Sequence, residues 1–439
     1  MQLKKKYASI LLMLFFVSIK LYAQDSTLVG TTIKWDLNKC IEYAKKNNIQ
    51  VNSLRLSMQT SQQEYELAKA ARLPNLSGSA TQNFAHSGNG SGFSASGNYG
   101  LNSSVTLYNG GYINNTILQK NLAVQSANLS ILQQENDITL QITQAYLAIL
   151  LDKENIIYDT DLVNTAQAQV KLEQQRYTVG TVARKDLIQL QAQQATDQYT
   201  LVNVQNVYRG DLLTLKQLLV LPSDVNFDIV KPDTIISSGE NVSPLRNTQD
   251  IANKTRPEIK NGMLDVQIAQ YDVAKANAGY KPSLLAGGSI GTGYTTGPGG
   301  GFGQLGNNFN QQVGLTLAVP IFTKRVVKTQ VEEAKIAVEQ SKLNLQNTKI
   351  VLSENVERAF INVQNAQSQY DAAAEQYKYN QEGYRIASEQ LRVGVASIVD
   401  FLLQKNLFVQ AQQAFVQAKY NVILSLKIYD FYRGVPITL

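Results

Sequence analysis

Two long stretches without glycine or proline constrain the fold of this sequence more than any other feature. They span residues 112–179 and 321–382. As continuous helices they would be about 100 Å and about 90 Å long, because an α-helix rises about 1.5 Å per residue. Apolar residues recur within them at three- and four-residue steps, as at Ile142, Ala145 and Ile149. The sequence therefore predicts very long helices that pack on neighbouring helices as coiled coils do.

Glycine is concentrated in two other regions, residues 77–111 and 283–303, which are also rich in Ser, Asn and Thr. Short segments of alternating apolar and polar residues flank them, for example 104–108 and 312–317. Such alternation is typical of strands whose two faces meet different surroundings. Each region is therefore predicted to form two strands joined by a flexible loop.

The same order of elements is predicted twice. Pro74 and Pro282 precede the two glycine-rich regions and lie 208 residues apart, whereas Gly180 and Gly394, after the long helices, lie 214 residues apart. Six extra residues in the loop 295–309 explain the difference, since exposed loops tolerate insertions. Repetition on this scale indicates one architecture built twice.

These features divide the chain into four parts. Residues 1–23 read as a signal peptide, with three lysines before an apolar run that is too short to span a membrane. The first repeat, residues 24–222, is predicted to run helix, two strands, long helix and returning helix. Residues 223–246 connect the repeats and hold a candidate short strand, and residues 247–439 form the second repeat. No apolar run of about 20 residues follows the signal peptide, so no transmembrane helix is predicted.

Composition limits the classes of function. The formal net charge of +6 falls to +2 when the signal peptide is removed, because 36 basic and 34 acidic residues remain. Charge therefore gives no support for a nucleic-acid partner. The single His86 and single Cys40 exclude a secure Ser-His-Asp triad and a zinc site with the usual His and Cys ligands. We expect a protein that is not an enzyme and has no catalytic residues, no metal and no cofactor.

The long helices end in matching turns. These turns read VGTVARKDL from Val179 and VGVASIVDF from Val393. Gly180 and Gly394 are placed to end a helix in the left-handed conformation, and a second helix restarts a few residues later. The two segments are therefore predicted to be the tips of αα-hairpins.

Several segments of the chain match one family in their order and spacing. They are the opening Trp35–Ala44, the alanine-rich run into Leu73-Pro74, the strand ends 107–111 and 319–322, and the two hairpin tips. Together they resemble the TolC-like outer-membrane efflux proteins (outer membrane factors), over essentially the whole mature chain and both repeats. The resemblance implies an α+β membrane protein that is a homotrimer. Each chain would give four strands to a 12-stranded β-barrel, and the helices would form a long periplasmic α-helical barrel.

The resemblance also implies a function and partners. It predicts an exit duct in the outer membrane of a Gram-negative cell, with most of the chain in the periplasm. The duct would serve a tripartite efflux pump or a type I secretion system and pass small molecules or proteins without chemistry. Its partners would be outer-membrane lipid, a periplasmic adaptor protein and an inner-membrane transporter that supplies the energy.

Elementary physics requires some such assembly. Four strands cannot close a barrel, because the smallest membrane barrels have about eight, and lipid does not tolerate an open sheet edge. Three chains would contribute twelve strands, an even number that can close. The strand regions contain more glycine, serine and asparagine than a lipid-facing band needs, which leaves the strand limits open.

Asp186 and Asp400 start the returning helices and have two interpretations. One is a carboxylate that stabilises the helix start through the local dipole, by about 0.3–1 kcal/mol. The other rests on the resemblance at Asp400 and is a ring of acids from three chains that favours cations at the periplasmic mouth and helps to hold it closed. Leu403 stands where the best-known member of the family has a second acid, so a weaker electrostatic gate is expected here.

The tip residues Val179, Gly180, Val393 and Gly394 also have two compatible interpretations. By themselves they form a tight turn. The resemblance places them where the family meets the hairpin of a periplasmic adaptor.

Aromatic residues in and beside the strand regions have three candidate places. They could form an interfacial girdle, line a barrel or lie in loops. These residues are Tyr99, Tyr108, Tyr294, Phe302 and Phe322.

Two other functions compete with the duct. One is a structural or adhesive envelope protein with a long helical stalk that conducts nothing. The other is a periplasmic adaptor, which would usually show one helical hairpin flanked by β-rich domains. Two strand pairs at matching places in two repeats favour the duct.

Overall fold

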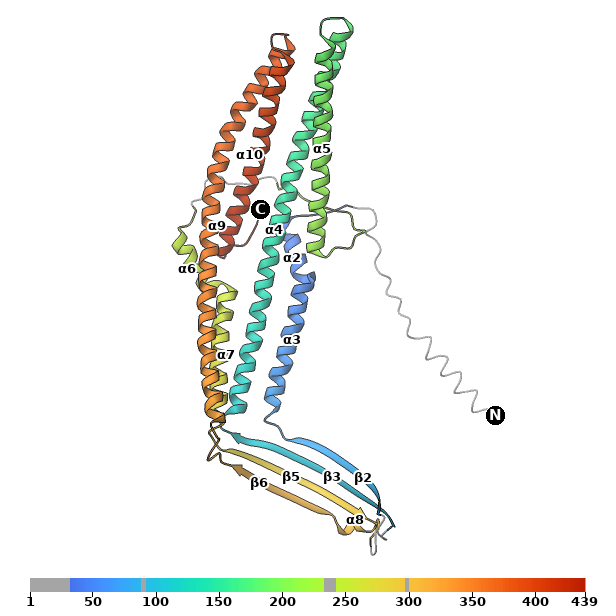
Figure 1. Cartoon of the computed structure of the whole chain (residues 1–439), viewed down its shortest axis with the longest axis vertical. Helices are drawn as coiled ribbons and strands as arrows, with labels where there is room; N and C mark the ends of the chain where they lie inside the picture. The colour runs from blue at the N-terminus through green and yellow to red at the C-terminus, as the bar shows by residue number, and fades with distance from the viewer. Residues whose placement is uncertain (1–31, 88–91, 233–241, 297–299, 439) are drawn as a thin grey trace, which may run out of the picture.

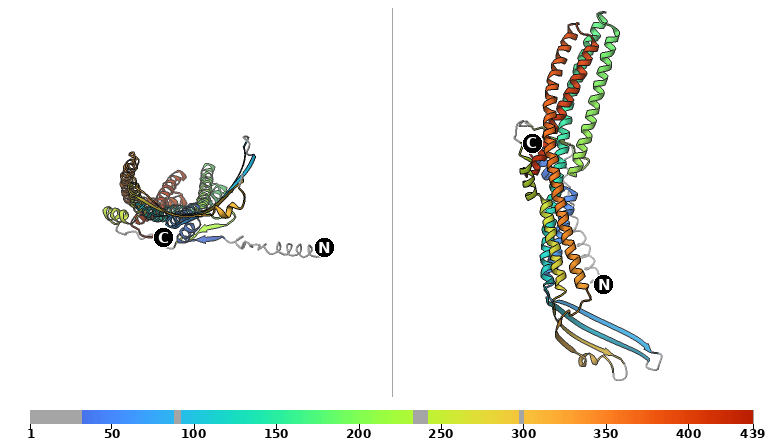
Figure 2. Two further views of the ribbon diagram at one scale, coloured as in Figure 1. Left: turned by 90° about the horizontal axis from the view of Figure 1, so that it is seen from below. Right: turned by 60° about the vertical axis from the view of Figure 1, so that its left-hand side comes forward.

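The computed structural model describes residues 32–87, 92–232, 242–296 and 300–438. The predicted signal peptide, residues 1–23, lies outside the described residues. Figure 1 shows an elongated molecule, with long helices at one end and a single sheet at the other. Seen from below, the helices and the sheet follow one shallow arc (Figure 2).

The two stretches without glycine or proline account for most of the two longest helices. These are α4 (Tyr112–Thr178) and α9 (Val326–Arg392), each with 67 residues. Helix α9 begins later than the predicted stretch and continues through Gly383. A Cβ atom on Gly383 would lie 3.1 Å from Gln404 Oε1 of α10 (Ile398–Tyr432), which is the end of a flexible side chain. The prediction of two very long helices is confirmed, with different bounds for the second.

Each long helix has different neighbours in its two halves. At the end far from the sheet, α5 (Arg184–Leu219) returns along α4, and α10 returns along α9. Figure 1 shows these two hairpins next to each other. Toward the sheet, α3 (Ile49–Ala70) packs on α4, and α7 (Pro257–Ala278) packs on both long helices.

A short helix precedes each of α3 and α7, where the sequence predicts one continuous helix. The short helices are α2 (Leu37–Asn47) and α6 (Leu245–Thr255). Asn48 separates α2 from α3, and its side-chain oxygen accepts hydrogen bonds from the first N–H groups of α3. Pro257 begins α7, because proline fits the first turn of a helix but not its interior.

The largest apolar core lies at mid-height, where α2, α4, α5 and α10 meet a small parallel sheet. In this sheet β1 (Ile33–Trp35) pairs with β4 (Phe227–Ile229). Tyr146 of α4 is 1% exposed, and its hydroxyl donates to the Val230 carbonyl at 2.5 Å. Cys40 is fully buried in the same core, and burial raises the pKa of its thiol to about 12. It therefore serves as a small apolar residue.

The other four strands form one antiparallel sheet in the order β2-β3-β5-β6. They are β2 (Asn75–Ser87), β3 (Gly92–Asn109), β5 (Ser283–Thr295) and β6 (Asn310–Ala318). The central pair β3–β5 joins the two halves of the chain, and Gly100 lies opposite Gly291 in its middle. Strand β6 is the shortest, and α8 (Gln304–Asn307) lies beside the end of β5 that β6 does not reach.

The fold is therefore α+β and mostly helical, as the sequence predicts. The element order α2-α3-β2-β3-α4-α5 recurs as α6-α7-β5-β6-α9-α10, with α8 added between β5 and β6. The proposed boundaries of the repeats stay a prediction. Among the described residues, no helix combines the length and the apolar character that crossing a membrane requires.

Candidate functional site

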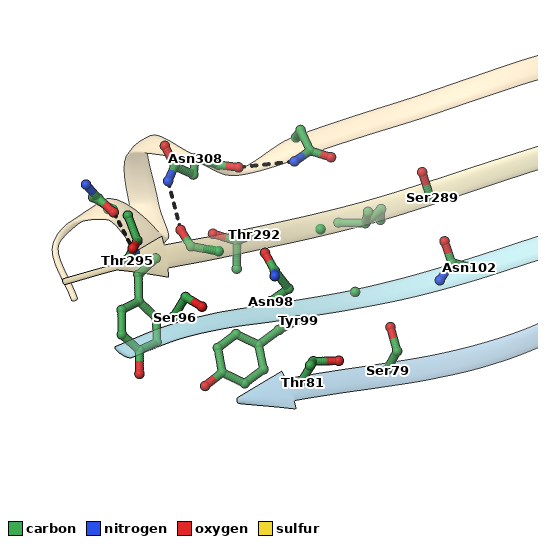
Figure 3. Close-up of a pocket in the computed structure, with 17 residues that line it drawn as sticks. Ser79, Thr81, Ser96, Asn98, Tyr99, Asn102, Ser289, Thr292, Thr295 and Asn308 are labelled. Carbon is green, nitrogen blue, oxygen red and sulfur yellow. Dashed lines mark hydrogen bonds between the residues drawn. The ribbon is translucent and has the colours of Figure 1, made fainter. Parts of the chain in front are cut away.

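The four-stranded sheet separates polar from apolar side chains onto opposite faces. Directly paired residues of antiparallel strands lie on one face, and successive residues alternate between faces. The pair Asn102–Ser289 therefore lies on one face and the neighbouring pair Leu101–Ile290 on the other. Figure 3 shows Asn102 and Ser289 pointing to one side of the sheet and Tyr99 to the other.

We call the face that carries Asn102 and Ser289 the polar face, because hydroxyl groups, amides and glycines make up most of it. Its hydroxyl and amide members include Ser77, Ser79 and Thr81 of β2, Ser96, Asn98, Asn102 and Ser104 of β3, Ser289 and Thr295 of β5, and Gln312 and Thr316 of β6. A hollow of about 580 Å³ lies on this face at the outer end of β3 and β5 (Figure 3). The glycine, serine and asparagine that make these strands weakly apolar in sequence are thus largely gathered on one side.

The opposite side, the apolar face, carries aliphatic residues along the middle of the strands. Val313 and Leu315 of edge strand β6 are 90% and 69% exposed. Leu101 and Ile290 in the centre of the sheet are 50% and 46% exposed. A face of this kind is normally covered by something apolar. The described part of this chain leaves it bare.

Aromatic rings stand at both ends of the apolar face. Phe84 and Phe93 stack at the outer end with ring centroids 5.9 Å apart. Tyr99 and Tyr294 lie near them on the same face, and Tyr108 lies at the end nearest the helices. The structure therefore places three of the five aromatic residues singled out in the sequence on the apolar face.

The other two aromatic residues lie outside the strands. Phe302 follows β5 and packs on Tyr294 with ring centroids 4.6 Å apart. Phe322 follows β6 and is 83% exposed.

The two hairpin tips have the same backbone geometry. Gly180 and Gly394 have φ values of 79° and 77°, the left-handed conformation expected there. In each tip the N–H after the glycine donates to a carbonyl five residues earlier, at 3.0 Å from Thr181 and 2.9 Å from Val395. Both helices are thus closed by the same hydrogen-bonded turn, which fixes the shape of the tip.

The valine before each tip glycine points into the surroundings. Val179 is 74% exposed and Val393 is 60% exposed. Apart from the glycine and its two chain neighbours, no atom of the residues that the structure describes lies within 4 Å of a Cβ built on Gly180 or Gly394, so each tip glycine has open space beside it. The tips therefore offer two small apolar surfaces on rigid turns.

The two predicted mouth acids lie in the first turns of the returning helices. Asp186 is half-buried at the start of α5, and Asp400 is exposed at the start of α10. The Ser397 hydroxyl accepts from the backbone N–H of Asp400 at 3.1 Å and donates to its carboxylate at 2.6 Å. The hydrogen bonds between Ser397 and Asp400 at the start of α10 therefore form within a single chain.

A hydrogen bond between residues far apart in the sequence joins the two tips. Arg176 Nη2 of α4 donates to the backbone carbonyl of Arg392 in α9 at 2.6 Å. The same guanidinium lies 3.6 Å from the buried carboxylate of Glu173. Burial raises the pKa of Glu173, Arg176 opposes the rise, and the charge of Asp186 adds to it.

Deeper between the hairpins, a buried ion pair joins α5 to α10. Lys405 Nζ contacts a carboxylate oxygen of Asp197, and the two residues are 1% and 8% exposed. Gln193 donates to the other oxygen of Asp197 at 2.9 Å. Asp159 of α4 lies nearby, and burial together with the charge of Asp197 raises its pKa to about 6. The ion pair therefore ties α5 to α10, with the Asp159 carboxyl of α4 beside it.

Aromatic rings fill the contact between α9 and α10 over the same stretch. They form two sets with seven-residue spacing, Tyr370, Tyr377 and Tyr384 on α9 and Phe401, Phe408 and Phe415 on α10. Their centroids lie 4.9 to 5.8 Å apart in an alternating stack. Seven-residue spacing is that of a coiled coil, in agreement with the packing that the sequence predicts.

Asp152 of α4 makes the stability of the fold depend on pH. Its side chain is buried, and burial together with the charge of Asp211 raises its pKa to about 7. In an unfolded chain the pKa of Asp is about 3.9. The folded state therefore holds the proton more tightly than the unfolded chain, and the contribution of this site to stability falls as pH rises from about 4 to about 7.

We expect Asp152→Asn to weaken this pH dependence, because an amide does not ionise. The midpoint of thermal unfolding in detergent should fall less between pH 5.5 and pH 8 in the variant than in the wild type. Asp371→Asn changes an exposed aspartate of α9 and should leave the pH dependence unaltered. Equal pH dependence in wild type and Asp152→Asn would show that the buried carboxyl is not its source.

The described residues contain no group of three or more His, Cys, Asp or Glu side chains that could hold a metal ion. What they do form is an open sheet with one polar and one apolar face, joined to a bundle of long helices. Such a sheet can bound a passage when other strands complete it.

The sequence matches the model of a known protein family. The sequence model of the family described as "Outer membrane efflux protein" matches residues 40–220 and 250–427, which together make up most of the chain. Comparison with curated protein sequences gives no match.

Solved structures match the chain over nearly its whole length. CusC, described in terms of folding and transmembrane channel formation, is 17% identical with a TM-score of 0.78, over 92% of this chain and 94% of CusC. The CmeC outer membrane channel of Campylobacter jejuni is 20% identical with a TM-score of 0.76, over 91% and 85%. The outer membrane protein VceC of Vibrio cholerae is 18% identical with a TM-score of 0.75, over 91% and 96%. At these identities the similarity shows a shared fold.

Proposed function

The chain belongs to the outer membrane efflux protein family, and on this premise we propose that three copies of it form a passive exit duct in the outer membrane of a Gram-negative cell. The strands of the three copies form a 12-stranded β-barrel, and the helices form a second barrel that extends into the periplasm. The duct serves a tripartite efflux pump or a type I secretion system. An inner-membrane transporter supplies the energy, and the solute crosses the duct without chemistry.

The open sheet is the observation that carries this proposal. Strands β2 and β6 are its two edges, and each presents a row of backbone N–H and C=O groups without partners in the described chain. Lipid does not tolerate such an edge, and a sheet of four strands is too small to close on itself. Pairing β6 of one copy with β2 of the next closes a ring of three copies and removes every edge.

The two faces of the sheet fit the two sides of such a barrel. The apolar face, on which the side chains of Val313 and Leu315 are largely exposed, meets lipid. Its aromatic residues at both ends correspond to the interfacial girdles of membrane barrels, with Phe84 and Phe93 at the outer end and Tyr108 at the inner end. The polar face lines the lumen.

The helical hairpins reach away from the sheet toward the adaptor. We assign adaptor contact to the two tip surfaces, with Val179 and Gly180 in one and Val393 and Gly394 in the other. Their exposed valines and rigid turns support this assignment, because an apolar side chain on a fixed backbone is a ready docking point. The helix starts at Asp186 and Asp400 lie at the same end, where three chains would bring six acids around the mouth.

Asp400→Ala tests whether these acids act as a ring. We expect the substitution to lower the preference of the conductance for cations over anions. Ser397→Ala is the matched control, since it removes the helix cap at a cost of about 1 kcal/mol but keeps the carboxylate. A folded trimer of Asp400→Ala with unchanged selectivity would leave this carboxylate with the helix-start role alone.

The duct itself is tested in a planar lipid bilayer. We expect the purified protein to be a trimer and to pass an ionic current. Arg176→Ala should raise that current, because it removes the hydrogen bond that ties the two tips together. A folded, inserted trimer that conducts nothing, with Arg176→Ala as well as in the wild type, would instead support the non-conducting structural or adhesive protein.

A further inference from the structure

The strand regions of the chain carry no charged side chain. The sequence has no Asp, Glu, Lys or Arg from residue 73 to residue 119, and none from residue 282 to residue 323. Elsewhere such residues are common, since they make up 17% of the whole chain. Both of these stretches without charged residues include the loops between the strands as well as the strands themselves. The absence of charge therefore holds for both faces of the sheet.

The single histidine, His86, adds no charge to the polar face. His86 of β2 lies opposite Phe93 of β3. Because Phe93 is on the apolar face, His86 is on the apolar face as well. The nearest charges along the chain, Arg72, Lys281 and Lys324, stand at the end of the strands that adjoins the helices.

Neutral hydrogen-bonding groups take the place of charges on the polar face. Asn98 and Asn102 of β3 and Ser289 of β5 line the hollow of about 580 Å³, together with hydroxyl groups of β2 (Figure 3). An amide or hydroxyl group offers both a donor and an acceptor. Such a surface can replace water around a cation, an anion or an uncharged polar group.

We propose that the strand-built part of the duct is an electrically neutral, hydrogen-bonding passage that admits polar solutes whatever the sign of their charge. This inference rests on the proposed function, because it assigns the polar face to the lumen of a closed barrel. Linings of one charge sign produce potentials of several kT and concentrate solutes of the opposite sign. The polar face has no source for such a potential. Any sorting of solutes by charge is left to the helical part of the duct.

Paired thiol reagents of opposite charge measure the potential at the lining directly. Asn98→Cys places a thiol on the polar face, and the natural Cys40 is silent because it is fully buried with its pKa raised to about 12. The probes are a cationic trimethylammonium and an anionic sulfonate methanethiosulfonate of similar size. We expect their rate ratio at Asn98→Cys to lie within about twofold of the ratio for a small free thiol, since a neutral lining favours neither ion.

Two variants act as controls. Leu101→Cys lies on the apolar face and should react with neither reagent in the membrane. Adding Ser96→Asp, two residues away on the same face, to Asn98→Cys should shift the ratio toward the cation by on the order of fivefold at low salt and less at high salt. Ser289→Cys repeats the measurement from β5 if Asn98→Cys does not assemble.

The outcomes separate this inference from the proposed function. A rate ratio shifted tenfold or more at Asn98→Cys and Ser289→Cys would overturn the neutral passage. So would a conducting trimer in which Leu101→Cys reacts and these two positions do not. A folded, inserted trimer that carries no current, with Arg176→Ala as well as in the wild type, would contradict the duct instead, whatever the rate ratio.

Discussion

Lys405→Ala is expected to lower the free energy of unfolding by about 3–5 kcal/mol, because it leaves buried carboxylates without a counter-charge. Lys405 is 1% exposed and holds Asp197, and Asp159 lies beside that pair. The loss should appear as a lower midpoint in chemical unfolding followed by helical circular dichroism in detergent. Because the pair joins α5 to α10, the tips should also become more accessible to proteolysis.

Two further variants show whether burial is the cause. Lys342→Ala removes a lysine from an exposed pair with Glu339 and should cost well under 1 kcal/mol. Lys405→Met combined with Asp197→Leu removes both charges and should recover much of the loss, since an apolar pair of similar volume often replaces a buried ion pair. If Lys405→Ala cost no more than Lys342→Ala, the buried cluster would not hold the hairpins together.

Leu315→Arg is expected to prevent assembly of the protein in the outer membrane. Leu315 lies on the apolar face of β6, and an arginine at the middle of a lipid-facing strand costs about 2–4 kcal/mol in each chain. In a trimer the cost applies three times. The readout is the amount of trimer in isolated outer membranes, which should fall to a small fraction of the wild-type amount.

The adjacent residue provides the matched control. Thr316 pairs with Leu285 on the polar face, so Thr316→Arg adds the same charge to the lumen side of the same strand. It should assemble and alter the ion selectivity of the conductance. If Thr316→Arg failed to assemble and Leu315→Arg assembled normally, the polar face would be the one that meets lipid.

The elements that the sequence predicts well are those with a local cause. The absence of glycine and proline predicts α4 and most of α9. Gly180 and Gly394 predict the tips, because a left-handed residue is needed to end each long helix. The spacing of Ser397 and Asp400 in the sequence matches a capping box, and the structure shows this helix cap.

The features that the sequence does not predict depend on distant pairs of residues. The two faces of the sheet become visible only when Gly100 is known to lie opposite Gly291, because shifting the register by one residue exchanges the faces. The ion pair of Lys405 and Asp197 joins residues 208 apart, so no local spacing marks it. The break between α2 and α3 is an exception. Asn48 is a favoured cap residue and could have indicated it.

The central claim is that three open sheets close into one ring, and the most direct test is to join their edges covalently. Cysteines in place of Ser77 on β2 and Thr316 on β6 both lie on the polar face near the helices. With a flexible reagent that links two thiols, the double variant should give covalent species of two and three chains and none larger, while each single variant stays uncrosslinked. A ladder that stops at two chains, or that continues past three, would contradict the twelve-stranded barrel.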